Sequence, residues 1–143
     1  MGFAAQLAAF RDKTAAKLDE VTRLTVTAVA GRVITELSPV GDPTLWMRSP
    51  PASYRPGNFR GNWFYGLGAP NRSTHDGVGI TTLNNAEALS SKAGGQKHYI
   101  SNSVEYAQAL EYGHSSQAPA GILGVMAFEM VDIAETSARK VAA

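Results

Sequence analysis

Residues 100–121, ISNSVEYAQALEYGHSSQAPAG, predict a stiff corner between two helices, and the rest of the fold can be read outward from it. Tyr106 and Tyr112 bring large amphipathic side chains to a short helix expected over residues 104–112, and their hydroxyl groups need partners when buried. Gly113 follows that helix and accepts the left-handed backbone that commonly ends one. The stretch therefore favours a rigid turn at this point of the chain.

The second half of the corner leads into a final helix. Gln117 carries an amide that can bond backbone groups at both ends, and Pro119 has the fixed φ that is typical of a first helical turn. Downstream, apolar residues that step by three and four predict the buried stripe of this helix: Ile122, Met126, Met130 and Ile133. Three acidic residues at three-residue spacing share another face: Glu129, Asp132 and Glu135.

The same corner contains Ser, His and Glu, so a small hydrolase that uses His114 with a nearby Ser or Glu is one alternative. The run Gly113-His114-Ser115, however, is not followed by the second glycine of a nucleophile elbow. A metal site would need a cluster such as His98, His114 and Glu111, because the three histidines show no HExxH spacing. Since the glycines also form no nucleotide-binding pattern, we expect no catalytic residue, no metal and no cofactor.

A long helix is predicted over residues 3–37. Apolar residues at three- and four-residue steps place one stripe along its first half: Phe3, Leu7, Phe10, Leu18 and Val21. The β-branched residues of the second half would suit a strand, but Val29, Val33 and Leu37 continue the four-residue steps. The usual rise per residue gives one helix of about 50 Å. It should end before Pro39, because the residue preceding a proline disfavours helical backbone.

A small sheet is predicted between the helices. Side chains alternate in residues 62–68, NWFYGLG, as they do in a strand. Two further strands are expected over 78–82 and 97–101, with a helix over 83–93 between them. The fold class is therefore α+β: a long N-terminal helix and a C-terminal helix packed on a small, mostly antiparallel sheet, with a long Pro-rich loop. The length indicates a single domain over residues 1–143.

Residues 38–62 hold five of the seven prolines and show no regular period. They also carry Trp46, Tyr54 and Phe59, and aromatic residues are unusual in plain disorder. Because a loop this long inside a compact domain is commonly functional, we expect residues 41–60 to order against a partner. One alternative is a surface insertion that packs on its own body. Another is a monomeric adaptor that binds peptides through the aromatic loop.

Charge is distributed unevenly, although the net charge is only +1. Residues 1–100 carry 11 basic and 7 acidic groups, whereas residues 101–143 carry 2 basic and 5 acidic groups. This division predicts two oppositely charged surfaces, unless the fold intermixes them. The lack of cysteine excludes disulfides and thiolate chemistry. No apolar run reaches the roughly 20 residues of a membrane helix, and we expect no secretory signal at the N-terminus.

The corner resembles the signature of a bacteriophage neck and tail-completion family, whose members are head–tail joining proteins or tail components of long-tailed phages. The matching parts are ISN at 100–102, YAQALEYG at 106–113, HSSQAPAG at 114–121, SPV at 38–40 and GNFRGNW at 57–63. The resemblance covers nearly the whole chain in order. Residues 41–56 look like an insertion, so their role does not follow from the family.

The resemblance implies a virion structural protein of α+β fold without enzymatic activity, located in the neck or tail and assembled in the bacterial host cytoplasm. It implies a homo-oligomeric ring, sixfold first and twelvefold second, that contacts other neck, connector and tail-tube proteins and no membrane. We also expect Arg48, Arg55 and Arg60 to make non-specific contacts with packaged DNA in the ring lumen. The residues expected at interfaces are Trp46, Arg48, Tyr54, Arg55, Arg60, Glu111, Tyr112, His114 and Gln117.

Overall fold

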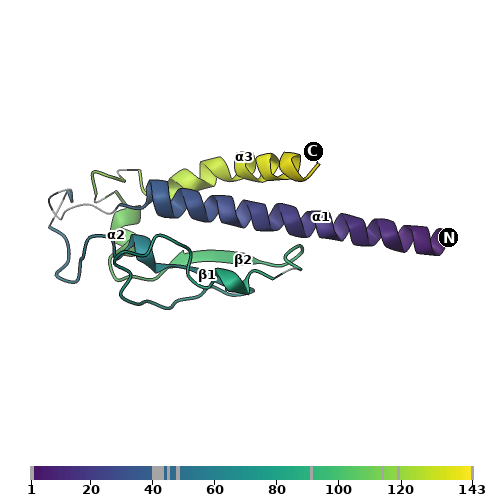
Figure 1. The fold of residues 1–143 in the computed structure, drawn as a ribbon. Helices are drawn as coiled ribbons and strands as arrows, with labels where there is room; N and C mark the ends of the chain where they lie inside the picture. Colours follow the sequence, from purple (N-terminus) through teal and green to yellow (C-terminus); the bar gives the residue numbers. More distant parts are fainter. Residues whose placement is uncertain are drawn as a thin grey trace.

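The computed structural model describes residues 2–39, 44, 46–47, 49–90, 92–113, 115–118 and 120–142. In chain order its elements are α1 (Phe3–Gly31), the π-helical turn η1 (Arg32–Leu37), the 3-10 turn η3 (Arg60–Asn62), β1 (Trp63–Leu67), the 3-10 turn η4 (Ala86–Ala88), β2 (His98–Asn102), α2 (Ala107–Glu111) and α3 (Leu123–Ala142). Figure 1 shows α3 along one side of α1 and the sheet along another. The predicted α+β fold is confirmed.

The N-terminal helix predicted over residues 3–37 is present as α1 continued by η1. Its last six residues wind as π-helix, which the sequence pattern did not indicate. Ser38 ends it, since the amide and the hydroxyl of Ser38 both donate to the carbonyl of Val33, at 3.0 and 2.6 Å. The same hydroxyl accepts a hydrogen bond from the indole of Trp63 at 2.8 Å, so the helix end is tied to the sheet.

α3 runs antiparallel to α1 and covers its C-terminal part (Figure 1). Arg32 fixes the start of this contact, because its Nε and Nη2 donate to the two carboxylate oxygens of Glu129, both at 2.8 Å. Arg32 also pairs with Glu36 one turn along the helix. Behind this pair lies the apolar core, which includes Val33, Ile34, Trp63, Leu110, Ile122 and Met126.

The pair makes stability depend on pH. The guanidinium of Arg32 lowers the pKa of Glu129 below its ordinary value of 4.5. Its contribution to stability is therefore complete above about pH 4.5 and is lost as the pH falls through the lower folded pKa. We expect the difference in melting temperature between the wild type and Glu129→Gln to shrink from about pH 7 to about pH 3. Glu105→Gln, at an exposed acid, should keep the wild-type profile; a constant difference for Glu129→Gln would contradict this coupling.

The sheet consists of β1 and β2 paired antiparallel, with Trp63 opposite Asn102 and Tyr65 opposite Ile100. Both strands lie within a residue or two of the predicted spans 62–68 and 97–101. β1 is buried on both faces. Trp63 packs toward the core, and the next side chain, Phe64, which lies on the opposite face of the strand, is also covered.

Two local predictions are wrong. The helix expected over 83–93 is reduced to the 3-10 turn η4, and 78–82 holds a turn and irregular chain in place of a strand. Asn84 explains both differences. Its backbone N–H donates to the carbonyl of Trp63 at 2.9 Å, and its backbone carbonyl accepts from the N–H of Tyr65 at 2.8 Å. Asn84 thus pairs with the edge of β1. The left-handed backbone of Asn85 (φ 61°) separates it from η4, and the extended backbone of Leu89 ends that turn.

Candidate functional site

The predicted corner is present, and Glu111 fixes its angle. The final helix begins at Leu123 and not near Pro119, which lies outside the described residues. The carboxylate of Glu111 accepts hydrogen bonds from the amides of Ile122, Leu123 and Gly124, at 3.1, 2.5 and 3.3 Å. These are amides at the start of α3 that have no partner within the helix, and a negative charge is favourable at that end. Gly121 lies against Glu111 with φ of 81°, a backbone that other residues rarely adopt. The corner is thus held by a side chain that the sequence had placed at an interface.

The Pro-rich loop packs on its own body where it is described. The rings of Trp46, Tyr54 and Tyr106 lie edge to face, with centroids 5.1 to 6.0 Å apart. Trp46 also forms a backbone bridge with Ser115 in the corner. The alternative of an insertion packed on its own body therefore describes these aromatic residues, of which Tyr106 is buried and Trp46 and Tyr54 are half-buried.

Two of the three arginines predicted at interfaces bond within the chain. Arg60 donates to the carbonyls of Ile34 and Thr35, both at 2.9 Å, so it satisfies backbone acceptors within η1. Arg55 is exposed and pairs with Asp76 at 3.2 Å. Arg48 and His114 lie outside the described residues, and so does any contact they make.

Two other predicted interface residues are on the surface of the corner. Tyr112 is 77% exposed, and Gln117 is exposed as well, with its backbone N–H donating to the hydroxyl of Ser115. Ser115 itself is buried. Within the described parts of the chain, no three His, Asp or Glu side chains gather closely enough to hold a metal ion.

A network of asparagines holds the irregular chain beside β1, and sequence reasoning missed it. Asn62 is fully buried; its amide nitrogen donates to the carbonyls of Asn58 and His75, at 2.7 and 3.1 Å. Its oxygen accepts from the amide of His75 at 2.9 Å. Asn58 in turn accepts from the amide of Gly77. Since buried polar groups need partners, this network fixes the loop and is explained without a ligand.

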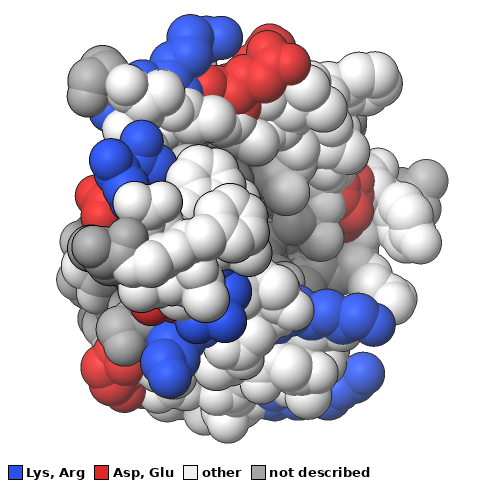
Figure 2. Space-filling view, turned by 90° about the vertical axis from the view of Figure 1, so that its right-hand side faces the viewer, with Lys and Arg blue, Asp and Glu red and all other residues white. Residues whose placement is uncertain are grey.

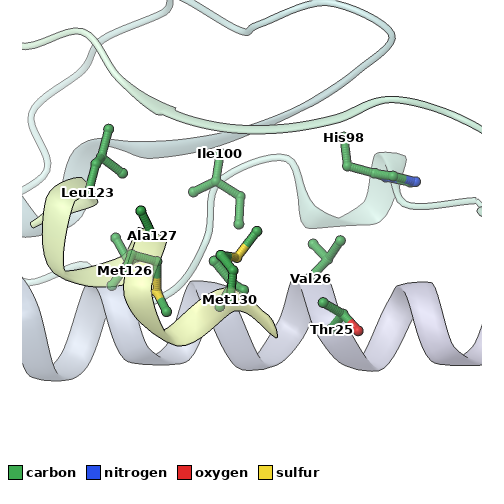
Figure 3. Close-up of a pocket in the computed structure, with 10 residues that line it drawn as sticks. Thr25, Val26, His98, Ile100, Leu123, Met126, Ala127 and Met130 are labelled. Carbon is green, nitrogen blue, oxygen red and sulfur yellow. The ribbon is translucent and has the colours of Figure 1, made fainter. Parts of the chain in front are cut away.

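An apolar groove of 320 Å³ opens between α1, β2 and α3 (Figure 3). Val26, Ile100 and Met126 represent its three walls. His98 closes one end, where its Nε2 donates to the carbonyl of Ala93 at 2.8 Å and its Nδ1 accepts from the hydroxyl of Tyr65 at 2.7 Å. Burial raises the pKa of Tyr65, so that hydroxyl keeps its proton. Both nitrogens of His98 are occupied, which leaves this end of the groove without a free base.

An uncovered apolar surface lies on the first half of α1. The predicted stripe is formed, but Phe3 and Phe10 are 78% and 68% exposed, and Leu7 and Leu18 are also exposed. Figure 1 shows why: α1 extends far beyond the end of α3, so none of the other described elements covers its first turns. We call residues 3–18 the α1 arm. Contiguous exposed apolar surface of this kind commonly marks an interaction site.

A second uncovered surface lies on α3. Ile122 and Met126 of the predicted stripe are buried, but Met130 is 44% exposed. Phe128 and Val131, which lie off that stripe, are 91% and 65% exposed. With Asp132 and Glu135 they share one side of the helix at three- and four-residue spacing, and we call these four residues the α3 outer face. The sequence signal was a pair of apolar residues, Phe128 and Val131, on the side of the helix away from the core stripe.

Charges do not separate into two fields on the face seen along α1 from its N-terminal end. Figure 2 shows basic and acidic side chains interspersed around a central area of uncharged ones. The intermixed alternative describes this face. In the described part of the chain, no helix is long and apolar enough to cross a membrane.

Comparison of the chain with the models of known protein families, with curated proteins and with solved structures finds no match.

Proposed function

We propose that this chain is a structural subunit of a phage virion, forming a ring in the neck that joins head to tail or completes the tail tube. The observation that carries the proposal is the pair of uncovered apolar surfaces, on the α1 arm and the α3 outer face. Phe3, Phe10 and Phe128 are exposed on elements that are otherwise well formed, which is expected of a subunit and not of a protein that works alone.

The corner supports the same proposal. Glu111 holds the start of α3 in place, and the aromatic rings of Trp46, Tyr54 and Tyr106 anchor the loop beside it. Of these residues, Tyr106 and Glu111 belong to the stretch that resembles the family signature, and Glu111 fixes the start of a helix whose outer face is exposed. A ring needs such fixed angles, because a small error between neighbouring subunits prevents closure. Sixfold symmetry is our first choice, with other neck, connector and tail-tube proteins as partners.

The test is genetic. A stop codon early in the gene for this chain, in the phage that encodes it, should give lysates in which heads and tails are both present but separate in negative-stain micrographs. Supplying the chain from a plasmid should restore joined particles, and a plasmid copy with the same stop codon should not. Normal joining in the absence of the chain would end the proposal. A serine-reactive probe on the purified chain tests the hydrolase alternative independently.

A further inference from the structure

The α1 arm carries an apolar stripe edged by cations. Phe3, Leu7 and Phe10 lie along the stripe, and Lys13 and Lys17 follow one another on one side of it. Both lysines are exposed, and among the described residues neither forms an ion pair. Burying each apolar side chain of the stripe would contribute to association, and an unpaired cation beside it favours an acidic partner surface.

The α3 outer face is the counterpart with opposite charge. Phe128 and Val131 are bare, and Asp132 and Glu135 stand beside them. Both acids are exposed, and neither pairs with a cation within the described chain. Each surface therefore has what the other lacks: an apolar ridge flanked by unpaired cations and an apolar ridge flanked by unpaired anions.

The two surfaces cannot meet within one copy. α1 is a continuous helix, α3 packs on it near Arg32, and the arm points away beyond the end of α3 (Figure 1). We propose that the α1 arm of one copy seats on the α3 outer face of the next copy, which rests on the proposed ring function and names its subunit contact. Two different patches meet in this contact, as a closed ring requires.

Symmetric pairing of two arms explains less. It would place two stripes edged by Lys13 and Lys17 against each other, with no acidic surface opposite either pair of lysines. It would also leave Phe128 and Val131 uncovered. The arm-on-α3 contact covers both apolar surfaces and pairs both sets of charges.

Cross-linking tests the contact directly, because the chain has no cysteine of its own. Chains carrying Leu7→Cys are mixed with chains carrying Val131→Cys and oxidised mildly, both in concentrated solution and in assembled particles. We expect a covalent heterodimer of the two. Leu7→Cys chains alone should give no dimer, and Gln96→Cys, at an exposed position before β2, should not link to Val131→Cys.

Charge exchange gives a second readout that a general loss of folding would not mimic. Lys13→Glu with Lys17→Glu, and separately Asp132→Lys with Glu135→Lys, should each weaken self-association by roughly 30-fold in analytical ultracentrifugation. Mixing the two variants should restore assembly, because every contact in an alternating ring then joins opposite charges. Circular dichroism of each variant should match the wild type.

Several results would overturn the contact. They are dimerisation of Leu7→Cys chains with themselves, binding of the arm to anionic phospholipid vesicles without any Leu7–Val131 link, and absence of the link both in concentrated solution and in assembled particles. Rings that form without this link leave the proposed function intact, whereas heads and tails that join without the chain remove that function whatever the link shows.

Discussion

Replacement of Gly61 by alanine is expected to lower the free energy of unfolding by about 3 kcal/mol, the upper end for overpacking a buried site. A Cβ at Gly61 would overlap the backbone carbonyl of Gly77, which passes directly over it. Neither backbone can yield easily. The carbonyl of Gly61 accepts from the side chain of Asn84 at 2.9 Å, and the amide of Gly77 donates to Asn58 at 2.9 Å.

Thermal unfolding measures the effect, which should be roughly 10 °C in melting temperature for a chain of this size. Gly31→Ala is the matched control, since it makes the same chemical change in helical backbone with nothing within 4 Å of the new methyl group. It should leave stability unchanged or raise it by up to about 1 kcal/mol. If Gly61→Ala unfolded at the wild-type temperature, the close approach of these two backbones would not exist in solution.

The elements that the sequence predicted well are those set by local pattern. The four-residue steps of Val29 and Val33 outweighed the β-branched composition, and the helix over 3–37 is there, although its π-helical end is not visible in a periodicity. The strands around Trp63 and Ile100 followed from alternation. The helix predicted over residues 83–93 did not form, because Asn84 bonds to a strand about twenty residues earlier in the chain. This non-local contact overrides the local helical preference.

The candidate interface residues show the same limit, because local pattern does not tell which side chains other elements cover. Periodicity placed Phe3 and Leu7 on one side of a helix, but it cannot say whether another element covers that side. Composition marked Tyr54 and Arg60 as interface residues, yet both are engaged within the chain, since aromatic and guanidinium groups serve folding and binding equally well. The bare Phe128 was missed because the search followed only the core stripe of its helix.

Glu111→Ala is expected to destabilise the chain by about 2 kcal/mol, the upper end for loss of a helix cap. The cap is not local: Glu111 precedes the amides of Ile122, Leu123 and Gly124 by 11 to 13 residues, so its loss also frees the corner between α2 and α3. A carboxylate that serves three amides at once cannot be replaced by solvent alone without loss of order.

Hydrogen exchange separates this cap from a general packing effect. In Glu111→Ala the amides of Leu123 and Gly124 should exchange faster by more than the global destabilisation accounts for, and Glu111→Gln, which keeps an acceptor but not the charge, should fall between. Glu105→Ala, at an exposed acid of the same stretch, should stay within about 0.5 kcal/mol of the wild type. Because the cap orients α3, Glu111→Ala should also weaken any assembly that uses Phe128, although Glu111 touches no part of that face. Unchanged exchange at the start of α3 would show that the corner is held by packing and not by the carboxylate.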